Sequence, residues 1–179
     1  MSGGAVEIRD DPPQGAAARA LFAEYMEFLR ERLDLPVLPA HVFASEDVFA
    51  GDGAWLVAFD AAGAPLGCGG LRVLAPGVAE IKRMYVSPRV RGTGVGRRLL
   101  RELEGRAGQG GVPRVRLLTT ELLTESRALY ASEGYGEIER IQRPGEPVEI
   151  WLEKRLQQPT TRRRRGPAAG RAAARHAAT

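Results

Sequence analysis

The sequence has little cysteine and little histidine. Cys68 is the only cysteine, so no disulfide can form within the chain, and this is typical of proteins in a reducing, cytoplasmic setting. The two histidines, His41 and His176, show no metal-ligand spacing with each other or with Cys68. The single cysteine excludes a secreted domain stabilised by internal disulfides. The few histidines and their spacing predict that the protein holds no metal.

A long apolar run is also missing. The clearest run, Ala54–Phe59, is far shorter than the roughly 20 residues that a membrane-spanning helix needs. The N-terminal residues 1–14 are polar and lack the apolar core of a signal peptide. We therefore expect a soluble cytoplasmic protein with no membrane partner. Its 179 residues are enough for one domain whose hydrophobic core can fold without disulfide bonds.

The positive charge is concentrated at the C-terminus. Residues 157–179 contain six arginines and no acid, so the net charge of +4 for the whole chain becomes −2 for residues 1–156. This tail has no aromatic or branched aliphatic residue, and we expect it to be disordered. Its run Arg162–Arg165 could attract nucleic acid, but a solvated extension is the simpler interpretation. The sequence therefore predicts a folded domain over 1–156 and a basic tail over 157–179.

Glycines gather in the stretch Arg91–Gly96, which reads Arg-Gly-Thr-Gly-Val-Gly. An apolar strand-like run, Ile81–Val86, precedes it, and an amphipathic helix-like run, Val95–Ala107, follows it. The first N–H groups of a helix have no partner within the helix, and the helix dipole adds about half a positive charge there. Glycines let an anion approach these groups closely. The stretch therefore predicts a binding site for a phosphorylated cofactor.

Two common phosphate-binding loops do not fit this spacing. A Walker A loop needs a lysine followed by serine or threonine after its last glycine, whereas Gly96 is followed by Arg97 and Arg98. A dinucleotide fingerprint needs a third glycine at position 97 or 99, which hold Arg97 and Leu99. The pattern that remains is Arg-x-x-Gly-x-Gly.

This pattern resembles the pyrophosphate loop of the GNAT superfamily of acyl-CoA N-acyltransferases, and the resemblance extends over residues 54–156. The run Ala79–Val86, ended by Ser87-Pro88, is similar to the fourth strand of the family, and Val115–Thr120 is similar to the fifth. Leu129–Tyr135 matches the Leu-Tyr-x-x-x-Gly-aromatic signature of the helix that follows. Four elements in the family's order and spacing make the resemblance specific.

The expected fold class is a mixed α/β (α+β) GNAT-like fold. The resemblance implies a central, mostly antiparallel mixed sheet that splays between strands 4 and 5 and is flanked by about four helices. From the residue pattern we expect strands at 6–9, 54–59, 66–74, 79–86, 115–120, 135–141 and 148–154. Helices are expected at 16–33, around 41–49, at 95–107, and in a segment that ends near Gly134.

The resemblance implies acetyl-CoA as the acyl-donor cosubstrate. Its diphosphate would bind the loop, and its pantetheine arm would pair with the backbone of the preceding strand. The resemblance assigns the cofactor to Met84, Tyr85, Val86, Arg91, Gly92, Thr93, Gly94, Val95 and Gly96.

Glu80 is the best candidate for the proton acceptor. An amine with a pKa near 10.4 is neutral in only about one molecule in 2,500 at pH 7, so a base helps the transfer. The resemblance places Glu80 in the strand where many family members carry such an acid. In a regular strand Glu80 shares a face with Lys82, Met84 and Val86, and the lysine favours an ion pair instead. Glu121 is a weaker substitute.

Tyr130 corresponds to the family tyrosine that protonates the leaving thiolate, although a core aromatic residue would show the same pattern. The family's asparagine seven residues earlier, which contacts pantetheine, is replaced here by Leu123. Tyr25, Phe28 and Trp55 fit either the core or an acceptor pocket.

We expect an N-acetyltransferase that moves an acetyl group from acetyl-CoA to a primary amine of a small molecule. Direct attack in a ternary complex is expected, because Cys68 has no histidine within its motif and the chain offers no credible nucleophile. The alternatives are a protein or peptide N-acetyltransferase and a non-catalytic acyl-CoA-binding module. A homodimer is left open, and nucleic acid is expected to contact the tail at most.

Overall fold

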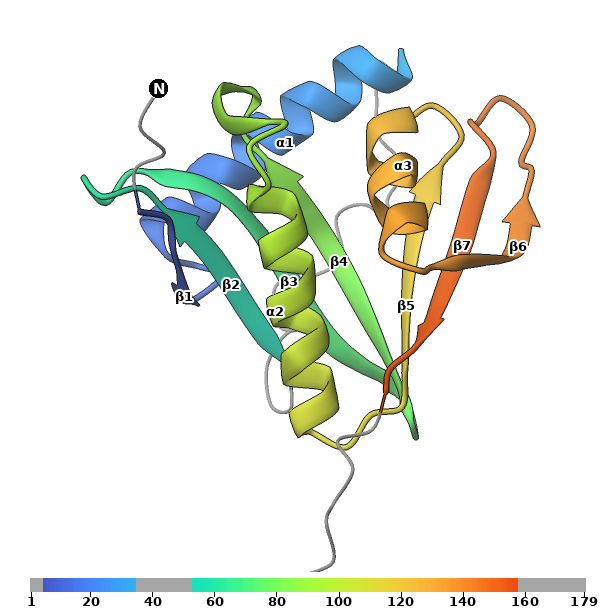
Figure 1. The fold of residues 1–179 in the computed structure, drawn as a ribbon. Helices are drawn as coiled ribbons and strands as arrows, with labels where there is room; N and C mark the ends of the chain where they lie inside the picture. The colour runs from blue at the N-terminus through green and yellow to red at the C-terminus, as the bar shows by residue number, and fades with distance from the viewer. Residues whose placement is uncertain (1–4, 35–52, 158–179) are drawn as a thin grey trace, which may run out of the picture.

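The computed structural model describes residues 5–34 and 53–157. Within them, three α-helices and a short 3-10 helix (η3) accompany a seven-stranded sheet (Figure 1). In chain order the elements are β1 (Glu7–Asp10), α1 (Ala16–Leu33), β2 (Ala54–Phe59), β3 (Pro65–Ala75), β4 (Val78–Val86), η3 (Pro88–Val90), α2 (Val95–Gln109), β5 (Arg114–Thr120), α3 (Thr124–Ser132), β6 (Gly136–Ile141) and β7 (Glu149–Arg155).

The sheet has the strand order β1-β2-β3-β4-β5-β7-β6. All neighbouring pairs are antiparallel except β4 and β5, which run parallel. The β4–β5 pairing begins at Val78↔Arg114 and ends at Ile81↔Leu117, so the second half of β4 has no partner on that side in the part described. Figure 1 shows the two strands diverging from there toward α1 and α3. The expected fold class, including the splay, is confirmed.

Helices cover both faces of the sheet. On one face α2 packs its buried leucines 99, 100 and 103 against Leu71, Ile81 and Val115 in the largest core cluster. On the other face α1 packs Leu21 against Trp55 and Val57. Burying each of these large apolar side chains stabilises the fold by about 1.5–3 kcal/mol. Packing on both faces therefore keeps the sheet rigid around the gap at the end of β4 and β5.

β4 contains a bulge at Arg83. This residue has a φ of 54°, a value that non-glycine residues rarely adopt. The β3–β4 register shifts at the same place, between Cys68 and Gly70, so that β4 gains one residue relative to β3. An extra residue of this kind bends the strand and reverses the alternation of its side chains. β4 therefore turns away from β5 where the splay opens.

The bulge changes which residues share a face. In a regular strand Glu80 and Lys82 would lie on the same face as Met84 and Val86. In the structure Met84 and Val86 join the core cluster beneath α2, whereas Tyr85 joins the cluster beneath α1. Glu80 alternates with residues of the α2 cluster, so it shares the α1 face with Tyr85.

The close approach of β3 to β4 next to the bulge depends on Gly67. A Cβ atom at this position would lie 2.7 Å from the backbone oxygen of Tyr85 and 3.2 Å from a methyl group of Leu99. We expect Gly67→Ala to lower the free energy of unfolding by about 1–3 kcal/mol, because the strand or the leucine has to shift. Thermal unfolding measures this loss. Gly136→Ala is the matched control, since no atom lies within 4 Å of its added Cβ, and an equal loss in both variants would contradict the account.

Most expected elements agree with the structure to within one or two residues. The helix over 16–33 and the strand over 54–59 have the predicted bounds. The helix or turn expected around 41–49 lies outside the described residues, as does nearly all of the basic tail. Within the described ranges no helix combines the length and the apolar character that crossing a bilayer requires.

Candidate active site

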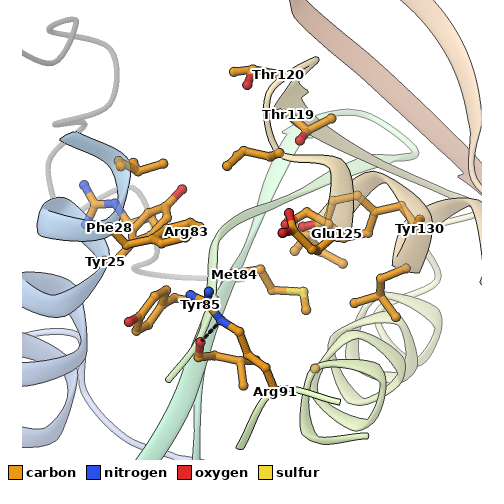
Figure 2. A pocket seen from close by; sticks show the side chains of 18 of the residues that line it. Tyr25, Phe28, Arg83, Met84, Tyr85, Arg91, Thr119, Thr120, Glu125 and Tyr130 are labelled. Carbon is orange, nitrogen blue, oxygen red and sulfur yellow. Dashed lines mark hydrogen bonds between the residues drawn. The ribbon is translucent and has the colours of Figure 1, made fainter. Parts of the chain in front are cut away.

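A cavity of about 770 Å³ opens where β4 and β5 separate (Figure 2). Its walls come from the second half of α1, the end of β4, the glycine-rich loop with the start of α2, the end of β5, and α3. Both predicted catalytic side chains, Glu80 and Tyr130, line this cavity together with Arg91, Gly92, Gly94 and Gly96 of the predicted phosphate loop, whereas Val95 of that loop is buried in the core. The fold therefore brings together residues that are up to 50 positions apart in sequence.

The glycine-rich loop connects η3 to α2 and leaves backbone N–H groups free. Gly92 and Gly94 have φ values of 78° and 91°, which favour glycine. Within the described residues, the N–H groups of Gly92, Gly94, Val95 and Gly96 have no backbone acceptor. Two of these belong to the first turn of α2, where the helix dipole attracts an anion. The loop thus has the geometry of a diphosphate site.

The remaining loop residues hold the loop in shape. The Thr93 hydroxyl donates to the Val90 carbonyl at 2.7 Å, and the Thr93 N–H donates to the same oxygen at 3.3 Å. Arg91 Nε donates to the Val86 carbonyl at 3.1 Å, and its guanidinium lies 4.4 Å from the ring centroid of Phe28. These contacts fix the loop against the end of β4 and against α1.

The two arginines after the loop face different ways. Arg97 lines the cavity, and its Nε lies 2.7 Å from a carboxylate oxygen of Glu133 just after α3. Arg98 donates to the carbonyl of Val6, beside β1, at 2.8 Å. Arg97 therefore lines the cavity as one partner of an ion pair with Glu133, and Arg98 links α2 to the chain before β1.

At the end of β4, backbone N–H and C=O groups point into the gap between β4 and β5. The Ser87 N–H donates to the Leu66 carbonyl at 2.9 Å, so the backbone of Ser87 faces β3. Backbone N–H and C=O groups alternate between the two edges of a strand, which places those of Tyr85 toward β3 as well. Those of Met84 and Val86 face the gap, where the Val86 carbonyl already accepts one hydrogen bond from Arg91 Nε. A chain that enters the splay can pair with these two residues, while Tyr85 presents its ring to the cavity.

Glu80 is buried, with 1% of its surface exposed, and is paired with two cations. Arg72 Nε donates to its Oε2 at 2.7 Å, and Lys82 Nζ lies 3.7 Å from its Oε1. Burial lowers the pKa of Lys82, and the charge of Glu80 opposes that effect. The ion pair named as the alternative for Glu80 is thus present, and the same carboxylate also lines the cavity.

Tyr130 projects from α3 to the cavity wall (Figure 2). Its ring packs against that of Tyr135, with centroids 5.9 Å apart. Burial raises the pKa of the Tyr130 phenol above its usual value of 10.0, and the nearby phenol of Tyr25 adds to this effect. Burial also raises the pKa of Tyr25 to about 12. Both hydroxyls therefore stay protonated at neutral pH and can act as donors.

The structure places the three aromatic residues that fitted either the core or an acceptor pocket in different surroundings. Tyr25 and Phe28 line the cavity from α1, whereas Trp55 is buried among the residues beneath α1. Tyr25 packs on Tyr85 with ring centroids 5.5 Å apart. Glu121, the weaker candidate for a base, is exposed and does not line the cavity.

The sulfur of Cys68 is in a poor position for nucleophilic attack. The residue is 1% exposed, and its Sγ lies 3.7 Å from the backbone oxygen of Arg83. Burial raises the pKa of its thiol to about 12, so the reactive thiolate is scarce at neutral pH. In the described part of the chain, no group of three or more metal-ligating side chains could hold an ion.

Contacts between α1 and the start of α3 cover one side of the cavity. Arg32 Nη2 lies 2.8 and 2.9 Å from the two carboxylate oxygens of Glu125, and its Nε donates to the Leu122 carbonyl at 3.2 Å. Leu33 and Leu123 belong to one buried cluster beside this ion pair. The cavity is therefore bridged between two elements that are distant in sequence.

Two polar residues of the cavity carried no recognisable signal in the sequence. Glu149, at the start of β7, is 6% exposed, and its Oε2 lies 2.6 Å from Nη1 of Arg143. Thr119 of β5 is 4% exposed, and its hydroxyl has no hydrogen-bond partner within the described structure. Only the strand register, which pairs Glu149 with Thr120, brings both to the cavity.

Comparison with known proteins agrees with this geometry. The model of the acetyltransferase (GNAT) family matches residues 16–135. An IAA acetyltransferase of Azospirillum brasilense is 30% identical over 150 residues, which span 83% of this chain and 95% of the relative.

Solved structures give the same result. A Klebsiella pneumoniae protein described as an acyl-CoA N-acyltransferase is 30% identical, with a TM-score of 0.66 over 85% of this chain and 98% of its own. A GNAT-family acetyltransferase of Staphylococcus aureus has a TM-score of 0.70 at 15% identity, over 86% of this chain and 100% of its own. From the matched residues and the splayed sheet, we conclude that this chain is an enzyme of the GNAT acetyltransferase family, whose members take their acyl group from an acyl-CoA.

Proposed function

We propose that the protein transfers an acetyl group from acetyl-CoA to a primary amine of a small molecule. The observation that carries this proposal is the cavity that joins a diphosphate loop, a strand edge whose backbone groups face the gap, a buried carboxylate and a protonated phenol. Holding the donor, stabilising its carbonyl, removing a proton from the amine and protonating the thiolate each have a candidate group there.

In this proposal the diphosphate binds the loop residues Arg91–Gly96, and the pantetheine arm extends between β4 and β5. Gly92, Gly94, Val95 and Gly96 offer N–H groups to the phosphates, and Met84 and Val86 offer backbone groups to the arm. A fixed N–H aimed at the developing oxyanion lowers the barrier by about 3 kcal/mol in acyl-transfer enzymes. The family's use of acyl-CoA supports the donor class, and the choice of acetyl is part of the proposal.

The transfer is proposed to be direct. The amine nitrogen attacks the thioester carbonyl, the carbon–sulfur bond breaks, and the products are the amide and CoA. The proton that the amine loses goes to Glu80, directly or through a water. The Tyr130 phenol donates a hydrogen bond and then its proton to the leaving thiolate. A covalent acyl-enzyme is disfavoured because Cys68 is buried and does not line the cavity, and no described residue of the cavity wall is a serine beside a histidine.

The charges around the cavity favour a small acceptor with few cationic groups. Each acid that lines it already has an arginine partner: Glu80 with Arg72, Glu125 with Arg32, and Glu149 with Arg143. An acceptor with several ammonium groups would therefore find no uncompensated carboxylate among these three. The bridge between α1 and α3 disfavours an open groove for a protein substrate.

The acceptor class is tested by measuring CoA release from acetyl-CoA with a panel of amines. We expect turnover with small monoamines or amino acids to exceed turnover with polyamines, aminoglycosides and peptides. Higher kcat/KM for peptides would favour the protein-acetyltransferase alternative. Tight acetyl-CoA binding without turnover on any amine would favour the non-catalytic acyl-CoA-binding module instead.

Tyr130→Phe is expected to lower kcat by about 100-fold or more, because general acid catalysis contributes at least that much. Phenylalanine keeps the ring that packs on Tyr135, so acetyl-CoA affinity and thermal stability should change little. Steady-state kinetics and calorimetry measure both quantities. Because burial raises the pKa of this phenol above 10, the wild-type kcat should show no loss from its ionisation up to about pH 10. An unchanged kcat in the variant would assign Tyr130 to the core alone.

A further inference from the structure

Thr119 holds a buried hydroxyl without a hydrogen-bond partner in the wall of the cavity. Its residue surface is 4% exposed, and within the described residues its Oγ1 meets no donor or acceptor. Figure 2 shows the side chain among those that line the pocket, with its oxygen directed inward. A buried polar group without a partner destabilises a fold, and such a group calls for an explanation.

The position of Thr119 on β5 indicates what could satisfy this hydroxyl. Leu117 is the last residue of β5 that pairs with β4, and Thr119 lies two residues further, beyond the start of the splay. Residues 115, 117 and 119 form the buried face of β5, and Val115 and Leu117 of that face pack in the cluster that includes Tyr130. The hydroxyl therefore belongs to the wall of the gap itself, on the side of α2 and α3.

Leu123 supplies no polar group to the cavity wall. It packs with Met26, Leu29 and Leu33 against α1 and can neither donate nor accept a hydrogen bond. Glu125, also at the cavity, is held by Arg32. Among the residues that the structure describes, Thr119 is a buried side chain of this wall whose hydroxyl has an unused donor and an unused acceptor.

We propose that the Thr119 hydroxyl hydrogen-bonds an amide group of the acyl-pantetheine arm and so positions the thioester in the splay. An amide offers one N–H and one C=O, and a threonine hydroxyl can accept from the first or donate to the second. This inference rests on the proposed function, because it requires acyl-CoA to bind in this cavity. Thr119 is a positioning residue here and takes no part in proton transfer.

The test compares acetyl-CoA binding by calorimetry to the wild-type full-length protein, Thr119→Val, Thr119→Ser and Thr120→Val. Valine keeps the shape of threonine and removes the hydroxyl, whereas serine keeps the hydroxyl. Thr120 is the matched control, because it also lines the cavity but its Oγ1 already accepts from the Leu122 N–H at 3.3 Å. A second titration uses adenosine 3′-phosphate 5′-diphosphate, the part of CoA without pantetheine.

We expect Thr119→Val to weaken acetyl-CoA binding about 10-fold, the effect of losing one hydrogen bond, and to leave binding of the nucleotide fragment unchanged. Its melting temperature should equal or exceed that of the wild type, because the unsatisfied hydroxyl is gone. Thr119→Ser should retain wild-type affinity, and Thr120→Val should change it less than twofold.

Several results would overturn the inference. They are an unchanged acetyl-CoA affinity in Thr119→Val, an equal loss for the nucleotide fragment, and an equal loss in Thr120→Val. A lower melting temperature in Thr119→Val would show that the hydroxyl serves the fold. A wild-type protein that binds no acetyl-CoA would overturn the proposed function as well, so the two failures are distinguishable.

Discussion

Replacing Gly94 by valine is expected to weaken acetyl-CoA binding by at least about 100-fold. Gly94 has a φ of 91°, and a side chain there is disfavoured by roughly 1–2 kcal/mol. A branched side chain also holds a diphosphate away from the free N–H groups of the loop, and each charge-assisted hydrogen bond is worth about 1.5–3 kcal/mol. The loss of two such hydrogen bonds costs about 3–6 kcal/mol, which exceeds the roughly 2.7 kcal/mol that corresponds to a factor of 100.

The fold should tolerate this substitution better than the site does. No atom lies within 4 Å of a Cβ built on Gly94, so the position itself is open. Calorimetric titration with acetyl-CoA measures the loss, and thermal unfolding measures the stability. Gly105→Ala in the middle of α2 is the control, since its added Cβ also meets no atom. Equal affinities in the two variants would show that the loop does not hold the diphosphate.

Replacing Glu80 by glutamine is expected to lower kcat by about 100- to 10,000-fold, the usual range for loss of a general base. Glutamine has the same shape but cannot take the proton from the amine. The affinity for acetyl-CoA should stay within about twofold of the wild type, because the carboxylate lies on the α1 face and the donor is proposed to pair with Met84 and Val86.

The same substitution also tests the structural role of Glu80. Removing its charge leaves Arg72 and Lys82 beside a neutral amide, and breaking a buried ion pair by removing one partner costs about 3–5 kcal/mol. Activity must therefore be compared at a temperature where the variant is fully folded. Glu153→Gln is the control, because Glu153 is ion-paired with Arg116 at 2.7 Å and does not line the cavity. A folded Glu80→Gln variant with wild-type kcat would leave Glu80 as a structural ion pair only.

The loop and the elements around it could be predicted because their signals are local. The glycines at 92, 94 and 96, the strand before them and the helix after them lie within about 30 consecutive residues. The helix over 16–33 could be predicted from its repeating leucines, and its bounds agree with the structure. The splay was expected from the family resemblance, since no local pattern in either strand encodes it, and the parallel β4–β5 pairing was not predicted.

The bulge at Arg83 could not be predicted, because it depends on how β4 meets β3. Nothing in the side chain of Arg83 favours a φ of 54°, and the conformation is held by the pairing on both sides of Cys68 and Gly70. The consequence is large. Without the bulge, Glu80 would share a face with Met84 and Val86, which pack beneath α2.

The polar contacts within the site also could not be predicted from the sequence. Lys82 was expected beside Glu80 from strand alternation, but the closer partner, Arg72, comes from the neighbouring strand through the β3–β4 register. The sequence around Glu149 and Thr119 shows only the alternation of an ordinary strand. The β5–β7 pairing brings both residues to the cavity. Contacts across strands depend on register, which a single sequence specifies weakly.

The measurement that tests the central claim most directly is CoA release by the wild-type protein from acetyl-CoA, with and without a small amine. The account predicts that release depends on the amine, that it saturates in both substrates, and that mass spectrometry finds one added acetyl group on the amine nitrogen. Release that is independent of every amine tested, or an acetyl group retained on the protein as an intermediate, would contradict direct transfer in the splay.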